Sequence, residues 1–535
     1  MKIHDLVTAA PPDAIALRQG EEAITYRELL AEADEIAGRL PVRASDVVAV
    51  SLPASPRLIA TLLAILSLDA VYTVIPPDWP SARAGQVLDQ TRARVHIAAE
   101  TVLREVDAEP VDGCCVFFTS GSTGRPKAVL ATHAGVLRVA FDPLLAFSAR
   151  TSMLQAAATA WDIFAMEVWA PLVHGGTVVL GTGSQFDLSW VRDGIARGVN
   201  TVFLTASLFN LVAEDDLDGL AGLEVLMSGG ERASVKHWAI VAERHPGIRL
   251  LHGYGPAEAT IATTFGRVRH PVPAELPIGR PIAETEIFVL DKALRPVERG
   301  MPGEIAIGGS GLAVGYLYDD AETARRFREL RQGRVYLTGD IATENPDGSY
   351  TFVGRRDRQL KISGVRVEPS EIERVIGDLP GVGSVAVIPA DGGLAAFYTT
   401  VSADAPDETT ARQAVADALP SPFVPGRVFR LAELPVTETG KLDHTRLAAI
   451  LAEGVPTPSH SPDSGLVAEI LRWLAETAHL PADADTDIFA AGATSVTAIR
   501  LAHALTQSTG RAIPAPTIFR HRTPAAIANA LTGPG

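Results

Sequence analysis

The residues best suited to chemistry form a loop of glycines and small hydroxylated residues after a short apolar run at residues 114–118. The loop consists of Thr119, Ser120, Gly121, Ser122, Thr123 and Gly124 and leads through Arg-Pro to Lys127. Glycines let backbone N–H groups converge on one point and the hydroxyls add donors, so this segment can cradle a polyphosphate. It is not a Walker loop, because no Ser or Thr directly follows Lys127. Taken alone, it is equally compatible with a flexible Gly/Ser loop.

The elements that would position this loop are β-rich runs separated by helical stretches. The runs lie at residues 47–51, 70–75, 95–98, 116–118, 177–180, 201–204, 224–227 and 249–252. Such alternation predicts α/β layers with buried, mostly parallel sheets. Ligands of these sheets bind in the loops beyond the carboxyl ends of the strands, and residues 228–231 and 253–256 lie in such loops beside the glycine loop. We therefore expect the site at this edge.

The sequence pattern changes after this α/β part. Short β-runs with Gly/Pro turns over residues 277–352 predict a small β-barrel-like part, and the charge-dense residues 354–361 suit a hinge. A compact α+β segment follows to about residue 453, and the Pro/Ser-rich residues 454–464 suggest a linker. Helical spacing then places Leu466, Val467, Ile470, Leu471 and Leu474 on one face, which predicts an all-α helical bundle at the C-terminus.

The composition is that of a soluble globular chain: 535 residues, 47% hydrophobic and 21% charged. A net charge of −16 argues against broad nucleic-acid or anionic-membrane partners, which need a cationic face. Cys114 and Cys115 are neighbours on a predicted strand and would face opposite sides, which excludes a disulfide framework and fits a reducing cytosol. We find no signal peptide or membrane span and expect a cytoplasmic enzyme.

Residues 114–127 resemble the phosphate-binding signature of the adenylate-forming superfamily, with Ala128 where that family usually has Gly. Further motifs follow in order along nearly the whole chain and end in a carrier-protein signature. The chain is thus similar to a free-standing adenylation–carrier didomain of nonribosomal peptide synthesis. The resemblance implies an adenylation core at residues 1–355, its C-terminal subdomain at 356–453, a linker at 454–464 and a peptidyl carrier at 465–535.

Several motifs resemble the family's nucleotide contacts. Tyr254 between two glycines resembles the adenine-binding position, where a flat base can stack on the ring, and Glu258 offers a hard oxygen ligand for Mg²⁺. Asp340 resembles the ribose-binding aspartate, with Leu337 where Arg is common, because a carboxylate accepts from both vicinal hydroxyls. The cofactor-binding residues implied are the loop Thr119, Ser120, Gly121, Ser122, Thr123 and Gly124 with Gly230, Tyr254, Gly255, Asp340 and Arg355. A packed tyrosine in a turn and an Asp–Gly turn are the structural alternatives.

Lys441 follows Gly440 in a segment that matches the family's C-terminal lysine motif. A mobile ammonium there would stabilise the two anions that meet when a carboxylate attacks the α-phosphorus of ATP. We expect Lys441 and Lys127 as the catalytic residues, against the alternative that Lys441 is an ordinary surface lysine. The resemblance also implies a hinge at Asp357.

Asp162 stands among Trp161, Ile163 and Phe164 and resembles the residue that pairs with the substrate α-ammonium. A carboxylate buried among apolar side chains is costly unless a cation offsets the cost, whereas a helix N-cap is the structural alternative. The family's pocket positions map to Asp162, Ile163, Met166, Ser207, Met227, Gly229, Gly253, Ile261, Ala262 and Lys441. Because this wall is mainly apolar, we expect an uncharged apolar amino acid, aromatic rather than large aliphatic.

Ser495 lies in an Asp-x-Phe-x-x-Gly-x-x-Ser frame that resembles the phosphopantetheine attachment site of carrier proteins, with Ala493 where a second Gly is usual. A helix-capping serine is the alternative. The resemblance implies ATP, Mg²⁺ and 4′-phosphopantetheine on Ser495 as cofactors. The implied partners are a phosphopantetheinyl transferase, downstream synthetase or tailoring enzymes and an MbtH-like accessory protein.

We expect two half-reactions, formation of an aminoacyl adenylate and transfer of the aminoacyl group to the carrier thiol, with delivery of the product in trans because the adenylation motifs begin within the first 30 residues. An acyl- or aryl-acid CoA ligase is the nearest alternative, disfavoured by Asp162 and Ser495. A non-catalytic nucleotide-binding scaffold is the alternative from another class.

Overall fold

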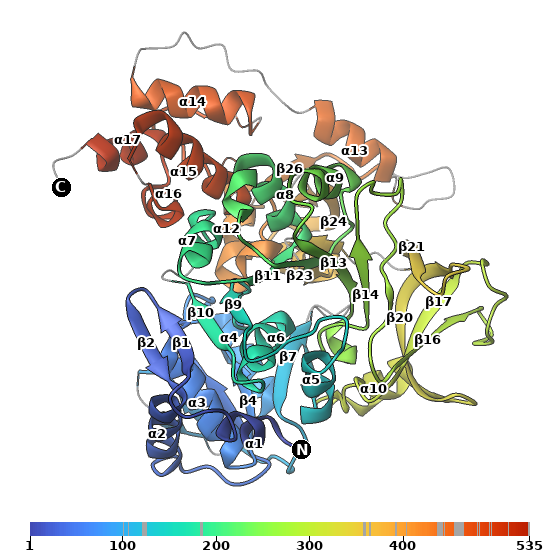
Figure 1. Ribbon diagram of the computed structural model, residues 1–535. Helices are drawn as coiled ribbons and strands as arrows, with labels where there is room; N and C mark the ends of the chain where they lie inside the picture. The colour runs from blue at the N-terminus through green and yellow to red at the C-terminus, as the bar shows by residue number, and fades with distance from the viewer. Residues whose placement is uncertain are drawn as a thin grey trace.

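The structure is a computed structural model of the chain (Figure 1). It describes residues 1–99, 101–104, 106–119, 126–181, 186–356, 360–362, 365–390, 393–402, 404–435, 442, 444–453, 465–478, 480, 482–489, 491, 493, 495–511 and 513–532. Two large sheets, whose strands interleave along the chain, are accompanied by a smaller antiparallel sheet, and an α+β segment and a helical bundle follow towards the C-terminus. This order agrees with the expected fold class.

The first large sheet carries the strand that leads into the glycine loop. Its order is β18 (Gly315–Tyr316), β8 (Lys127–Ala131), β7 (Cys115–Thr119), β4 (Val71–Val74), β3 (Val47–Val50), β5 (Val95–Ile97) and β6 (Thr101–Leu103). Strands β3, β4, β5 and β7 run parallel, whereas β8 returns antiparallel to β7. A strand therefore follows the loop, rather than the helix that a Walker loop opens.

The second large sheet supplies most of the remaining site loops. Its order is β15 (Arg280–Pro281), β14 (Thr264–Val268), β13 (Arg249–Tyr254), β12 (Val225–Gly229), β11 (Thr201–Thr205), β9 (Ser152–Gln155), β10 (Thr177–Leu180), β1 (Ile15–Gln19) and β2 (Glu22–Thr25). The run from β13 to β1 is parallel, so the carboxyl ends of β9, β11, β12 and β13 meet at one edge. The predicted strands of both sheets are confirmed within one or two residues at their ends.

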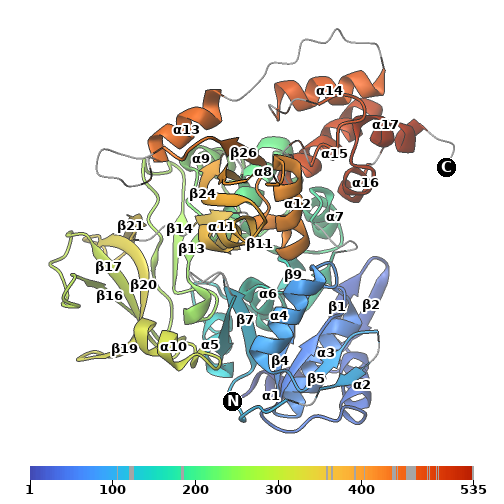
Figure 2. The same cartoon turned by 180° about the vertical axis from the view of Figure 1, so that it is seen from behind.

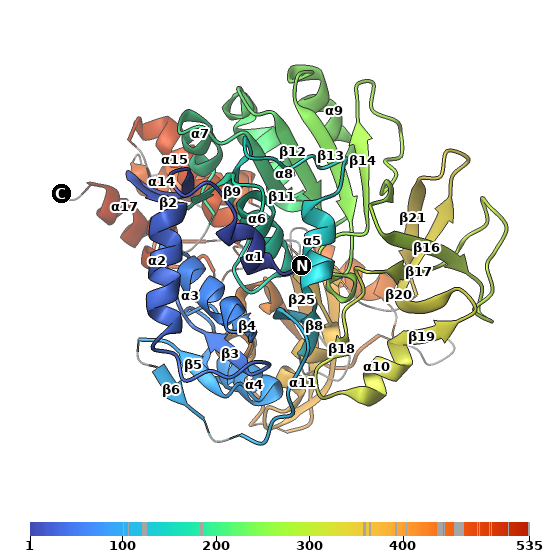
Figure 3. The ribbon, with the colours of Figure 1, turned by 60° about the horizontal axis from the view of Figure 1, so that its bottom comes forward.

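Helices cover and separate the two sheets. They are α1 (Ile3–Thr8), α2 (Tyr26–Ala37), α3 (Pro56–Ser67), α4 (Ser81–Thr91), α5 (His133–Ala140), α6 (Asp162–Leu172), α7 (Ser189–Ala196), α8 (Ala206–Asp215) and α9 (Val235–Arg244), with short 3₁₀ turns η1 (Leu217–Leu220) and η2 (Ala257–Ala259). Figure 3 shows α5 and α6 in the middle, between the strands of the two sheets. The predicted start of α2 is confirmed, because Thr25 and Glu28 form a reciprocal capping box.

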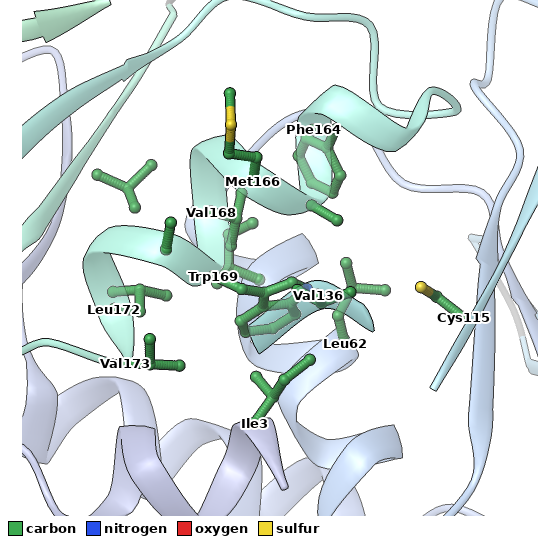
Figure 4. Packing of buried hydrophobic residues seen from close by; sticks show 14 of the residues in the cluster. Ile3, Leu62, Cys115, Val136, Phe164, Met166, Val168, Trp169, Leu172 and Val173 are labelled. Atoms are coloured by element: carbon green, nitrogen blue, oxygen red, sulfur yellow. The ribbon is translucent and has the colours of Figure 1, made fainter. Parts of the chain in front are cut away.

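Helix α6 explains how the two sheets share one core. Its side chains from Phe164 to Leu172 are buried all round, as expected for a helix enclosed on every side. Figure 4 shows Trp169 of this helix among Ile3, Leu62 and Val136. The indole N–H of Trp169 donates to the Tyr72 hydroxyl at 2.8 Å, which satisfies the one polar atom that this ring buries.

The two cysteines are free and buried, as expected, but they do not face opposite sides. Both belong to the core around α6, and their sulfur atoms lie 3.4 Å apart. The expectation was wrong because β7 begins at Cys115, so strand alternation does not extend to Cys114.

The third sheet is antiparallel throughout. It contains β16 (Thr285–Leu290), β17 (Gly303–Gly309), β20 (Gly333–Glu344), β19 (Phe327–Leu330) and β21 (Tyr350–Arg355), with α10 (Asp320–Arg326) beside it. It lies in the residue range for which the sequence predicts a small β-barrel-like part, and β20 and β21 place Asp340 directly opposite Arg355.

The α+β segment and the helical bundle lie on the same side of the molecule (Figures 1 and 2). The former holds β22 (Leu360–Ile362), β23 (Val365–Val367), β24 (Val382–Ala390), β25 (Gly393–Thr400), β26 (Arg427–Leu431), α11 (Pro369–Gly377), α12 (Glu408–Ala418), η3 (Ser421–Phe423) and α13 (His444–Glu453). The bundle consists of α14 (Leu466–Glu476), α15 (Ser495–Thr509), α16 (Ala515–His521) and α17 (Pro524–Thr532), and α15 packs on α8. Among the residues described, none of the helices has the length and apolar character needed to cross a membrane.

Candidate active site

A cavity of about 1010 Å³ lies at the edge where the strands of the second sheet end. It is lined by the ends of the strands of both large sheets, including Thr119, Gln155, Thr205, Gly229 and Tyr254. Residues of the antiparallel sheet, the α+β segment and the helical bundle complete the wall. The cavity therefore lies where the strand order predicts a site, and every part of the fold contributes residues to its wall.

Tyr254, Asp340 and Arg355 form one connected group at this cavity. The Tyr254 hydroxyl donates to one carboxylate oxygen of Asp340 at 2.6 Å, and Arg355 pairs with the other oxygen. Burial raises the pKa of Tyr254 well above its ordinary value, so the phenol keeps its proton and donates. An aspartate held in this way is fixed in position and retains acceptor capacity for ribose hydroxyls.

The described edge of the glycine loop offers one donor without a protein partner. Thr119 ends β7, and its buried hydroxyl makes no hydrogen bond in the part of the chain that the structure describes. Buried hydroxyls are normally satisfied, so a ligand oxygen is the expected partner. The remaining loop residues Ser120, Gly121, Ser122, Thr123 and Gly124 lie outside the described residues, as do Asp357 and Lys441.

Lys127 begins β8 and is nearly buried, with its ammonium 2.6 Å from the Glu322 carboxylate and 5.4 Å from the centre of the Tyr316 ring. Burial alone would raise the pKa of Glu322, but hydrogen bonds from Arg325 and Lys127 lower it to about 2. Lys127 is thus tied to α10 and is not among the residues that line the cavity.

Glu258 is fully buried and pairs with Arg366, whose Nη1 lies 3.2 Å from the carboxylate. Tyr316 donates to the same oxygen at 2.7 Å. Burial alone would raise the pKa of Glu258, but the Arg366 charge holds it below the ordinary value. A single carboxylate suits Mg²⁺ bound together with substrate phosphates, and no group of three or more His, Cys, Asp or Glu that could hold a metal occurs among the described residues. In this arrangement Arg366 supplies the positive charge beside Glu258.

Arg366 belongs to β23, so this ion pair joins the α+β segment to η2 of the α/β core. Sequence reasoning missed it, although a signal exists, because Arg366 alternates with the buried Val365 and Val367 and must face away from their core. Arg366 also lines the cavity.

Asp162 is the first residue of α6 and lines the cavity together with Ile163. Trp161, not Asp162, occupies the N-cap position, and one Asp162 oxygen accepts the Ile163 N–H at 3.0 Å. Asp162 therefore lies in the same cavity as Tyr254, as an ammonium-binding residue requires. Trp161 packs against the core of the α+β segment.

The other predicted pocket positions divide into two groups. Ser207, Gly229, Gly253, Ile261 and Ala262 line the cavity. Met166 and Met227 are instead buried in the core around α6 and are not among the lining residues (Figure 4 shows Met166). The glycines have a structural role besides leaving volume, because a Cβ on Gly229 would lie 2.3 Å from the Gly253 carbonyl oxygen.

Two acidic residues that sequence reasoning missed shape the pocket wall. Glu231 accepts the Ser207 hydroxyl at 2.5 Å, so that hydroxyl is already engaged. Glu167, buried within the apolar α6, accepts the backbone N–H groups of Ala156 and Ala157 at 3.1 and 3.0 Å. Burial raises the pKa of Glu167 to about 8. A lone acid in an otherwise apolar helix is the signal that could have identified it.

The helical bundle forms part of the cavity wall. Phe489, Ala493, Ile499, Phe519 and Arg522 line it, and the rings of Phe489 and Phe519 stack 5.2 Å apart. Helix α15 begins at Ser495, between two of these lining residues, although the Ser495 side chain lies outside what is described. Ala493 and Ile499, the lining residues that flank this position in the sequence, bring the carrier to the cavity wall.

The comparisons with known proteins agree with this architecture. The model of the AMP-binding enzyme family matches residues 5–112 and 103–317, and the phosphopantetheine attachment site model matches residues 465–531. Malpibaldin synthetase of Mortierella alpina is 31% identical over 98% of this chain, and the dimodular nonribosomal peptide synthase of Bacillus subtilis (strain 168) is 30% identical over 97%. This chain spans 10% and 24% of their lengths.

Among solved structures, holo-PA1221, an NRPS protein containing adenylation and PCP domains bound to a vinylsulfonamide inhibitor, is 29% identical with a TM-score of 0.86. The match covers 100% of this chain and 96% of that one. The chain belongs to the AMP-binding enzyme family and has the adenylation–carrier organisation of a nonribosomal peptide synthetase didomain, with ATP and phosphopantetheine as its cofactors.

Proposed function

We propose that this chain activates an uncharged, mainly apolar amino acid with ATP and transfers it to a phosphopantetheine thiol on its own Ser495. The observation that carries this proposal is that a single cavity is lined by the Asp340 group, by Asp162 and by Ala493 and Ile499, which lie on either side of the start of the carrier helix α15 in the sequence. The reacting groups of both half-reactions can thus meet without a second site.

In the first half-reaction, Asp340 and Arg355 position the ribose, and Thr119 donates to a phosphate oxygen. Asp162 pairs with the α-ammonium, which leaves the substrate carboxylate directed at the α-phosphorus. Lys441 stabilises the negative charge that builds there, and pyrophosphate leaves. Glu258, together with the phosphates, would hold Mg²⁺, which would supply charge neutralisation there.

In the second half-reaction, the carrier must approach the same cavity. A phosphopantetheine arm on Ser495 would supply the thiol, whose sulfur would form the thioester bond with the aminoacyl carbon as the acyl–phosphate bond breaks and AMP leaves. Arg366 then neutralises Glu258, and the ion pair of Arg83 with Glu371 holds the α+β segment against α4. We propose that the structure represents this second orientation and that Asp357 is the hinge between the two.

The substrate preference follows from the pocket wall. Ile163, Ile261 and Ala262 are apolar, and the Ser207 hydroxyl is already bonded to Glu231. We infer an aromatic side chain ahead of a large aliphatic one, because Phe186, Phe203 and Trp190 also line the cavity.

The partners follow from the chemistry. A phosphopantetheinyl transferase must modify Ser495, and downstream synthetase or tailoring enzymes would take the loaded group. An MbtH-like accessory protein is a further proposed partner. We place the reaction in the cytoplasm, where ATP and reduced thiols coexist.

The direct test is amino-acid-dependent ATP–pyrophosphate exchange over a panel of amino acids, with aryl and fatty acids included. Mass spectrometry of the holo chain then measures covalent loading. Ser495→Ala should leave exchange intact and abolish loading, whereas Lys441→Ala should lower adenylate formation about 10²- to 10³-fold. Exchange with aryl acids alone would instead indicate a CoA-ligase-type enzyme, and absence of exchange with every acid would indicate a scaffold.

A further inference from the structure

We propose that the acidic C-terminal end of α8 is a docking site (the dock) that recognises a positive charge on the carrier, and that Arg500 is the carrier residue that it recognises. This inference rests on the proposed function, because the dock matters only if the carrier is loaded here.

The contact joins two parts of the chain that are distant in sequence. Arg500 pairs with the Glu214 carboxylate, and its Nε lies 3.1 Å from the Asp215 carboxylate. The three side chains keep between 24% and 33% of their exposure, so the pairs lie at the rim of the contact. Arg500 stands five residues after Ser495 on the same helix, so its position sets where the start of α15 faces.

The acidic end of α8 is costly without a cation from elsewhere. Glu214, Asp215 and Asp216 are consecutive at a helix C-terminus, where the helix dipole disfavours negative charge. Asp216 is paired with Arg192 of the core. For Asp215, Arg500 is the only Lys or Arg partner within the described residues.

The dock is also held in place within the core. His237 bonds to the other Glu214 oxygen at 2.7 Å, and the second ring nitrogen of His237 bonds to Ser234 at 2.6 Å. A preorganised carboxylate loses less freedom when the carrier arrives, which favours selectivity.

The other contacts between the carrier and the core contribute to affinity rather than to selection among carriers. Asp187 accepts the Ala515 N–H at 3.1 Å, a backbone donor that every residue except proline offers. Apolar side chains of the carrier and of the core belong to one buried cluster, among them Ile499 and Phe209. Unlike this backbone contact, the ion pairs depend on which charged side chain the carrier presents. The partner that fits is a carrier helix with a guanidinium at this position, and a carrier with a carboxylate there would be repelled.

The experiment uses the holo form of all 535 residues. Arg500→Glu, the double variant Glu214→Lys with Asp215→Lys, and the triple charge swap are compared in single-turnover loading and in hydrogen–deuterium exchange of residues 206–215 and 495–509. Arg472→Glu on α14, an exposed position, makes the same change in net charge and is the control.

We expect Arg500→Glu and the double variant each to lower the loading rate about tenfold or more and to lose protection of α8 and α15. The triple swap should restore both, and the control should match the wild type. Pyrophosphate exchange should stay unchanged in all of them.

Wild-type loading and protection in Arg500→Glu would overturn the inference, and so would a triple swap that fails to restore them. If neither the wild type nor any variant shows pyrophosphate exchange, the proposed function is wrong. The pattern of hydrogen–deuterium protection then tests the dock by itself, because protection does not depend on catalysis.

Discussion

Arg83 of α4 and Glu371 of α11 form an ion pair in which the side chains retain only 1% and 0% of their exposure. The two residues are 288 positions apart, and the pair joins the adenylation core to the α+β segment. The rings of Trp79 and Phe423 flank the Arg83 guanidinium at 5.8 and 5.7 Å. Such a pair can form only when the two parts are docked as they are here.

Removing one partner should therefore weaken this docked orientation selectively. Glu371→Gln leaves Arg83 buried without its counter-charge, at a cost of about 3–5 kcal/mol. We expect loading of the carrier to slow at least about tenfold while pyrophosphate exchange is retained, as measured by mass spectrometry and isotope exchange.

A matched double variant separates docking from charge. Arg83→Met with Glu371→Leu replaces the pair by apolar groups of similar volume, which is often neutral in stability. Loading should recover in this variant. Equal loss of exchange and loading in Glu371→Gln would contradict the assignment, because it would indicate a folding defect.

Thr119→Val tests the phosphate-binding role of the buried hydroxyl. Valine keeps the shape of threonine, and the hydroxyl has no hydrogen-bond partner in the described part of the chain, so stability should change little. The KM for ATP in the exchange reaction should rise about five- to tenfold. An unchanged KM together with a raised melting temperature would show that the hydroxyl is only an unsatisfied group.

Asp162→Asn tests the ammonium contact. Amide and carboxylate have nearly the same volume, but the variant cannot neutralise a cation, and truncating a buried charge pair costs about 2–5 kcal/mol. The kcat/KM for the amino acid should fall at least about 30-fold, whereas the KM for ATP should stay within about threefold. Activity that persists with amino acids would remove the reason for preferring them over other acids.

His133 predicts a pH dependence of stability. Burial, followed by the charges of His4 and Lys2, lowers the pKa of His133 from 6.5 to about 4, and its Nδ1 accepts the Ile3 N–H at 3.3 Å. The unfolded chain therefore binds more protons between these values, so the contribution is present above about pH 6.5 and is lost as the pH falls towards 4.

The measurement is the free energy of unfolding of the wild type and of His133→Asn across pH 4–7. With allowance for solvent screening, the wild type should lose roughly 1–2 kcal/mol more than the variant over this range. Parallel curves for the two proteins would rule out His133 as the cause.

Much of the fold and the motif loops could be predicted from the sequence. Runs such as residues 178–180 and 202–204 are continuous and apolar because both faces of a parallel strand are buried, and each carries its own signal. The capping box of Thr25 and Glu28 could likewise be recognised from its own residues. The motifs of Tyr254 and Asp340 predict contacts with one nucleotide, and the structure adds a direct hydrogen bond between the two side chains.

By itself, then, the sequence determined the strands, the order of the motifs and the chemical types of the site residues, because those depend on neighbours within a few positions. Only the tertiary structure decided that Arg366 meets Glu258, that Arg83 is enclosed with Glu371 and that Arg500 reaches Glu214. It also placed Met166 and Met227 in the core instead of the pocket wall. The reason is physical: which charge faces which depends on how separately folded parts pack, and no local pattern records the partner across such a contact.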